Sequence, residues 1–127
     1  MSHFSRVRTK LVNLDTLRNA LEELGHQVLA ESSMVRGWST RTTKAELVVE
    51  SGRDNYDIGA VRNKDGTLDL VADWSMIHVD QRAFVGKVSQ RYSWIALKEN
   101  ARRKGYTVAR EQVREDGVVQ LVLRKFV

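Results

Sequence analysis

The start of the chain alternates between apolar and basic side chains. Along residues 4–12, one face carries Val7, Thr9 and Leu11, and the opposite face carries Arg6, Arg8 and Lys10. A period of two is typical of a β-strand with one buried face. The pattern therefore predicts a strand over residues 4–12 with a cationic outer side.

Two later segments have the period of an α-helix instead. In the first, leucines recur every three or four positions, at Leu14, Leu17, Leu21 and Leu24. Asn13 or Asp15 can cap its start, and Gly25 follows its last turn, where glycine commonly ends a helix. A second, longer helix is predicted to begin after Asp80 and to run to about Lys104, just before another glycine.

The remaining apolar segments predict strands. Two are expected near Gln27–Glu31 and Ala45–Glu50, joined by a long polar connection. The others pair as hairpins, Tyr56–Arg62 with Leu68–Trp74 and Thr107–Val113 with Val118–Phe126. Each hairpin is closed by a turn that contains Asp-Gly, a strong hairpin signal.

Strands that cluster into hairpins predict an α+β fold rather than a doubly wound one. We expect a single domain over residues 1–127, with one mostly antiparallel sheet of about six or seven strands and two helices packed on one face. A weak internal repeat suggests a duplicated helix–strand–strand unit as an alternative description. Leu17, Gly25, Val28 and Glu31 recur 80 positions later as Leu97, Gly105, Val108 and Glu111.

The composition limits the cellular environments and the classes of partner that we expect. The chain has 127 residues, no cysteine and a net charge of +5, so disulfides and thiolate metal sites are excluded. No apolar run has the length of a signal peptide or of a membrane span. We therefore expect no membrane insertion and a cytoplasmic location. The positive charge is compatible with nucleic acid, anionic lipid or an acidic protein partner, or with solubility alone.

No catalytic motif or cofactor signature stands out. The glycines do not form a phosphate-binding loop, and no two histidines have the spacing of metal ligands. The best carboxylate set is Asp57, Asp69 and Asp73, on the two arms of one predicted hairpin. Neighbouring carboxylates can bind a divalent ion, but solvated charges on an outer strand face are commoner. We therefore expect no cofactor and keep these three as weak metal candidates.

The long helix carries a cationic stripe. At about 100° per residue, one narrow face presents Lys87, Arg91, Trp94, Lys98 and Arg102. Cations around an aromatic ring suit phosphate contacts and base stacking. The alternative is a solvated face on which the tryptophan covers the edge of the core.

The polar connection contains a second basic patch. It comprises Arg36, Trp38, Arg41 and Lys44, within a predicted loop over residues 34–44. Partner surfaces are enriched in tryptophan and arginine, and loops commonly carry binding residues. The Trp38 side chain either folds back onto the domain or remains available to a partner.

Several short segments together resemble one protein family. They are Met1–Ser5, Val35–Trp38 followed by Thr42–Thr43, Tyr56–Gly59, Leu70–Asp73, Val88–Tyr92 and Gly105–Tyr106. In this order they are similar to the uncharacterised plastid and cyanobacterial family called hypothetical chloroplast reading frame thirty-five, over nearly the whole chain. The resemblance implies a cytoplasmic or stromal protein, and it supplies no activity, cofactor or catalytic residue.

These observations favour a non-enzymatic accessory or binding module that presents the basic Trp38 loop to an unknown protein partner. A nucleic-acid-binding protein that uses the helical stripe is the alternative, and a small enzyme is the third class. Affinity for nucleic acid would fall steeply with salt, because each phosphate contact releases a counterion. A homo-oligomer formed through unpaired strand edges is also compatible with the predicted sheet.

Overall fold

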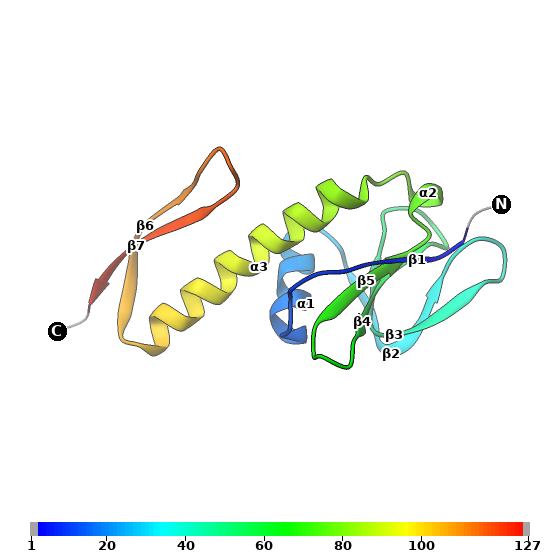
Figure 1. The fold of residues 1–127 in the computed structure, drawn as a ribbon, viewed down its shortest axis with the longest axis horizontal. Coiled ribbons are helices and arrows are strands. Elements are labelled where there is room, and N and C mark those ends of the chain that lie inside the picture. The colour runs from blue at the N-terminus through cyan, green and yellow to red at the C-terminus, as the bar shows by residue number, and fades with distance from the viewer. Residues whose placement is uncertain (1–2, 126–127) are drawn as a thin grey trace.

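The computed structural model describes residues 3–125 as an antiparallel sheet, two main helices and a separate hairpin (Figure 1). The sheet has the strand order β1-β5-β4-β3-β2. Its strands are β1 (Ser5–Val7), β2 (Val28–Arg36), β3 (Thr42–Glu50), β4 (Asp57–Arg62) and β5 (Leu68–Ala72). The helices are α1 (Leu14–Glu23), α2 (Trp74–Ile77) and α3 (Gln81–Arg103). The hairpin pairs β6 (Tyr106–Val113) with β7 (Val119–Lys125).

Both predicted helices form where their capping residues place them. The side chain of Asn13 accepts a hydrogen bond from the backbone N–H of Thr16 at 3.0 Å and so starts α1. Asp80 does the same for Ala83 at 3.2 Å at the start of α3. These caps satisfy backbone donors that have no partner within the helix, and they confirm the predicted starts of both helices.

The main core lies between the sheet and the two helices. Its fully buried members come from α1, β3, β4, β5 and α3, and they include Leu17, Leu21, Leu47, Ile58, Leu68, Leu70 and Val88. Residues of α1 and α3 share this one cluster, so the prediction that two helices pack on the sheet is confirmed. Within residues 3–125, none of the helices combines the length and apolar character that crossing a membrane requires.

The start of the chain and the end of β5 differ from their predictions. The first strand pairs with β5 over Ser5–Val7 alone, so the predicted strand over residues 4–12 was too long. Beyond β1 the chain turns toward α1, and the Thr9 hydroxyl accepts the N–H of Leu11 at 3.0 Å. Strand β5 ends at Ala72, because Trp74 begins α2 and its indole N–H donates to the carbonyl of Ser5 at 3.0 Å.

The predicted loop over residues 34–44 is wrong, because most of it is strand. β2 and β3 pair as far as Arg36 and Thr42, which leaves a turn over residues 37–41. The pair curls over the second face of the sheet, where Val35, Ala45, Val48 and Val71 form a small buried cluster. Gly59 lies beneath this curl, and a β-carbon there would be 2.4 Å from Cγ2 of Val35. The glycine therefore permits a close approach that no other residue allows.

The prediction of one sheet with six or seven strands is also wrong. β6 and β7 are paired as predicted, but they form their own two-stranded sheet, beside the C-terminal half of α3 (Figure 1). With 23 residues, α3 is roughly 35 Å long, which carries the chain away from the large sheet. The order helix–strand–strand does recur, as α1-β2-β3 and α3-β6-β7, but the second pair of strands does not join the first. Phe126, the predicted end of the last strand, lies outside the described residues.

Candidate functional site

Arg36 and Asp57 form the first anchor of the β2–β3 turn. Asp57 is 2% exposed, and its Oδ2 accepts both the backbone N–H and the Nε–H of Arg36 at 2.9 Å. Nη2 of the same guanidinium donates to Oδ1 at 2.8 Å. A bidentate pair of this kind is the strongest geometry for an arginine and a carboxylate. Asp57 raises the pKa of Arg36 further, through hydrogen bonding and charge attraction.

Asp73 supplies the second anchor. It is 1% exposed, and its Oδ2 accepts the backbone N–H of Trp38 at 3.0 Å. Asp57 precedes and Asp73 follows the cross-strand pair Ile58–Ala72, so the two carboxylates lie at the same end of β4 and β5. Two buried acids thus hold alternate residues of the segment that leaves β2.

The turn itself is closed by backbone hydrogen bonds and by an aromatic ring. The N–H of Gly37 donates to the carbonyl of Arg41 at 3.1 Å, and the N–H of Arg41 donates to the carbonyl of Trp38 at 3.1 Å. The Phe4 ring packs on Gly37, where a β-carbon would be 2.7 Å from the ring. Ser39 takes a left-handed φ of 59° at the tip. Backbone hydrogen bonds and the Phe4 ring therefore hold the turn in one conformation.

Trp38 is partly exposed on this fixed turn, with 41% of its surface accessible to solvent. Lys44 is also exposed, and Met34, its cross-strand partner, is a further exposed apolar residue. Of the four predicted partner-binding residues, the structure places Trp38, Arg41 and Lys44 on the exposed part of the hairpin. Arg36 differs, because its guanidinium is bonded to Asp57 and fixes the turn.

The three candidate metal-binding acids do not form a shared site. Asp69 accepts hydrogen bonds from Nε of Arg6 at 3.0 Å and Nδ2 of Asn63 at 2.7 Å, whereas Asp57 and Asp73 bond to the β2–β3 turn. Among residues 3–125, no three histidine or acidic side chains gather where they could hold a metal ion. The expectation of solvated outer-face charges was wrong, since all three are buried. Alternation along a strand could not reveal this, because the donors that cover the acids come from other segments.

Only part of the predicted α3 stripe lines one hollow, and acidic side chains neutralise part of its positive charge. Arg91, Trp94, Lys98 and Arg102 line one hollow of about 410 Å³. The charged groups of Arg91 and Lys98 lie 5.1 and 5.9 Å from the centroid of the Trp94 ring. Acids from other elements meet the same cations: Glu23 lies 3.4 Å from Arg91, and Glu111 lies 2.8 Å from Lys98.

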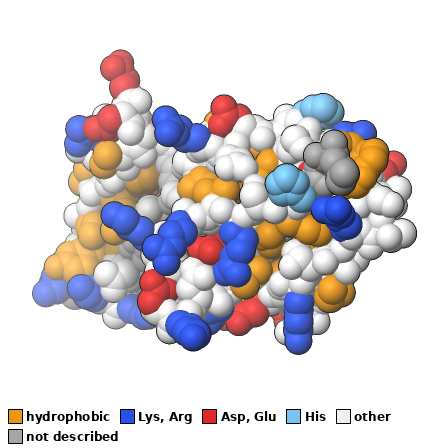
Figure 2. All heavy atoms as spheres, turned by 45° about the vertical axis from the view of Figure 1, so that its right-hand side comes forward, with side chains coloured by type: hydrophobic (Ala, Val, Ile, Leu, Met, Phe, Trp, Pro, Cys, Tyr) orange, Lys and Arg blue, Asp and Glu red, His pale blue; other side chains and the backbone are white. Residues whose placement is uncertain are grey.

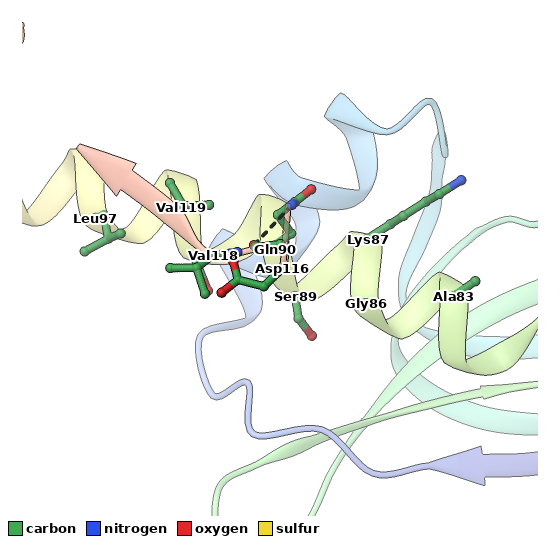
Figure 3. A pocket seen from close by; sticks show the side chains of 11 residues that line it. Ala83, Gly86, Lys87, Ser89, Gln90, Leu97, Asp116, Val118 and Val119 are labelled. Carbon is green, nitrogen blue, oxygen red and sulfur yellow. Dashed lines mark hydrogen bonds between the residues drawn. The ribbon is translucent and has the colours of Figure 1, made fainter. Parts of the chain in front are cut away.

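Lys87 lies apart from that hollow and lines another, between α3 and the β6–β7 turn (Figure 3). This second hollow has a volume of about 620 Å³. Small or apolar side chains form much of its lining, including Ala83, Gly86, Leu97, Val118 and Val119. Gln90 crosses it and donates to the carbonyl of Gly117 at 3.2 Å, which ties the tip of the hairpin to the helix (Figure 3).

Comparison with known proteins identifies the family. Residues 20–122 match the model of a family described as "Protein of unknown function (DUF1257)". The chain belongs to the DUF1257 family. Two relatives, both named "Uncharacterized protein ycf35", come from Guillardia theta, with 32% identity, and Pyropia yezoensis, with 27%. Each alignment covers 99% of this chain and 98% of the relative. No solved structure matches the chain.

Membership of DUF1257 confirms the resemblance inferred from short segments, and the structure shows that several of these segments meet. Val35–Trp38, Tyr56–Gly59 and Leu70–Asp73 contribute the arginine, the two buried acids and the tryptophan of the turn. Phe4, from the opening segment, packs on the same turn, whereas Met1 and Ser2 lie outside the described residues. Four stretches far apart in the sequence thus build one structural feature.

Proposed function

We propose that this DUF1257 protein is a non-enzymatic binding module that presents the β2–β3 turn to a protein partner. The observation that carries the proposal is an exposed tryptophan on a turn held by two buried carboxylates. Tryptophan and arginine dominate the energetics of protein interfaces. Trp38 offers a large apolar surface, and basic side chains lie beside it in the sequence of the same hairpin.

The rigidity of the turn adds to this argument. Ordering a flexible loop on binding lowers the affinity, because the loop loses conformational entropy. Here the hydrogen bonds from Arg36 and Trp38 to the acids already fix the backbone. A partner would therefore meet a surface in its bound shape.

The test compares variants of two exposed apolar residues, Leu29 near the start of β2 and Trp38 in the turn that follows its end. We expect immobilised wild-type protein and Leu29→Ala to retain the same partner from cell extract, and Trp38→Ala to lose it. Leu29 is a matched control, because it is 43% exposed, close to the 41% of Trp38. Purified partner then gives a Kd for each variant, with a loss of about 2 kcal/mol or more for a tryptophan hot spot. Equal retention by Trp38→Ala would overturn the proposal.

Nucleic-acid binding through the α3 stripe is the second candidate. The shared hollow around Trp94 supports it, because Arg91, Lys98 and Arg102 surround a ring on which a base could stack. The ion pairs with Glu23 and Glu111 reduce the charge available to phosphates. We expect any binding by this surface to weaken with salt and to be lost when Lys87, Arg91, Lys98 and Arg102 are all changed to Glu. Binding unaffected by these changes would exclude the stripe.

A further inference from the structure

The β6–β7 hairpin has two chemically different sides. Paired residues of an antiparallel ribbon share a side, and the register assigns them as follows. The side toward α3 carries Val108, Glu111, Val113, Val119, Leu121 and Leu123. The contact between Glu111 and Lys98 of α3, at 2.8 Å, confirms that this side faces the helix.

The opposite side is mostly polar and faces solvent, with Val122 as its apolar member. It presents Thr107, Arg110, Gln112, Gln120, Val122 and Arg124, and every one of these residues is exposed. Within residues 3–125, neither Arg110 nor Arg124 forms a side-chain ion pair. Two arginines and two glutamines are therefore available on one surface of a narrow ribbon.

The end of α3 and the ribbon together carry most of the excess positive charge of the chain. Arg102, Arg103 and Lys104 lie at the end of the helix, and the ribbon itself, residues 106–125, has four basic and three acidic residues, a net charge of +1. Residues 102–125 contain seven basic and three acidic residues, a net charge of +4 out of the total of +5. The remaining residues contain fourteen basic and thirteen acidic residues, and so are nearly neutral. Figure 2 shows basic side chains, with acidic ones among them, over the face of the molecule that it presents.

We propose that the outer side of the β6–β7 ribbon binds duplex DNA by entering the major groove. That groove is about 12 Å wide and admits a two-stranded ribbon, whose strands lie about 4.8 Å apart. Arg110 and Arg124 are suited to phosphates or guanine edges, and Gln112 and Gln120 to adenine edges. Duplex RNA does not fit equally well, because its major groove is too narrow for side chains to read.

The ribbon is held in position for such a contact. Its tip is attached to α3 by Gln90 and Gly117, and its middle by Lys98 and Glu111. The ribbon and the Trp38 turn lie toward opposite ends of the molecule (Figure 1). This inference is therefore independent of the proposed protein-binding function, and it places DNA contacts on a different surface from the α3 stripe.

The experiment titrates a fluorescent DNA duplex of mixed sequence with full-length protein, from about 50 to 200 mM salt, the range over which phosphate contacts are revealed. Arg110→Gln/Arg124→Gln is compared with wild type and with Arg8→Gln/Lys10→Gln. Both double variants lose the same charge, and all four substituted residues are exposed. Thermal melting checks that each variant is folded.

We expect wild type and the Arg8→Gln/Lys10→Gln control to bind DNA alike. The ribbon variant should bind roughly tenfold more weakly or worse, as the loss of arginine contacts predicts. Its slope of log K against log salt should be shallower by about two, since each lost phosphate contact removes about 0.9. Trp38→Ala should leave DNA binding unchanged, which separates this result from that of the protein-binding proposal.

Three results would overturn the inference. The first is no DNA binding by wild type at the lowest salt. The second is an equal loss of DNA affinity in the ribbon variant and in the Arg8→Gln/Lys10→Gln control, which would indicate a general effect of charge. The third is equal affinity for duplex RNA with the same dependence on Arg110 and Arg124, which would exclude recognition through the major groove.

Discussion

The close approach above Gly59 makes a strong prediction about stability. In Gly59→Ala, the new β-carbon would lie 2.4 Å from Cγ2 of Val35, 2.8 Å from Cβ of Ala45 and 3.2 Å from Cγ1 of Val71. All three neighbours are buried in one cluster, so none can move aside freely. Overpacking of a core costs about 1–3 kcal/mol. We expect the free energy of unfolding to fall by that amount, a large part of the 5–15 kcal/mol typical of a domain.

Urea denaturation of wild type and Gly59→Ala measures this loss directly, as a lower midpoint with an unchanged slope. Gly86→Ala is the matched control, because a β-carbon at that exposed helical position meets no atom within 4 Å. That control should be stabilised by about 0.5–1 kcal/mol, since alanine favours a helix over glycine. Unchanged stability of Gly59→Ala would refute the idea that the β2–β3 curl requires a bare backbone at this position.

Three further predictions concern the aspartates Asp57, Asp73 and Asp65. Arg36→Gln should lower the free energy of unfolding in urea titrations by about 1–3 kcal/mol, because it leaves the buried Asp57 carboxylate without its cation. Asp57→Asn should cost less, because the half-exposed Arg36 can be hydrated instead, and a larger loss for Asp57→Asn would contradict this reasoning. Asp73→Ala should accelerate hydrogen exchange at the Trp38 amide with little effect on core amides, and unchanged protection would show that the bond does not hold the turn. Hydrogen bonds from the hydroxyl and backbone N–H of Thr67 lower the pKa of Asp65 below its ordinary value of 3.8. Its contribution to stability should be complete above that ordinary value and decline as the pH falls through the lowered pKa, a dependence that Asp65→Asn should remove and that an NMR titration of the carboxyl group checks.

Local signals in the sequence predicted the elements whose causes are local. The caps at Asn13 and Asp80 started both main helices, and the two Asp-Gly turns closed their hairpins, because the interacting groups are only a few residues apart. Family membership was likewise predictable from short segments in a fixed order.

The candidate site depended on contacts that are distant in the sequence. From the sequence, Asp57 and Asp73 were interpreted as solvated charges on a strand, because the alternation of residues along a strand does not show which segment will cover each face. Their partners, Arg36 and the Trp38 amide, lie 21 and 35 residues away. The curl that brings these groups together depends on the space above Gly59, which is a property of four strands at once.

The last hairpin likewise combines features that are local in the sequence with a position that depends on the tertiary structure. Its pairing was predicted from its own residues, whereas the shift of register between Val108 and Arg110 was not. Whether it joined the large sheet was decided by the length and direction of α3, which carries it to the far end of the molecule. Hydrogen bonds across a turn are local, but the docking of one completed element on another depends on the packing of the whole chain.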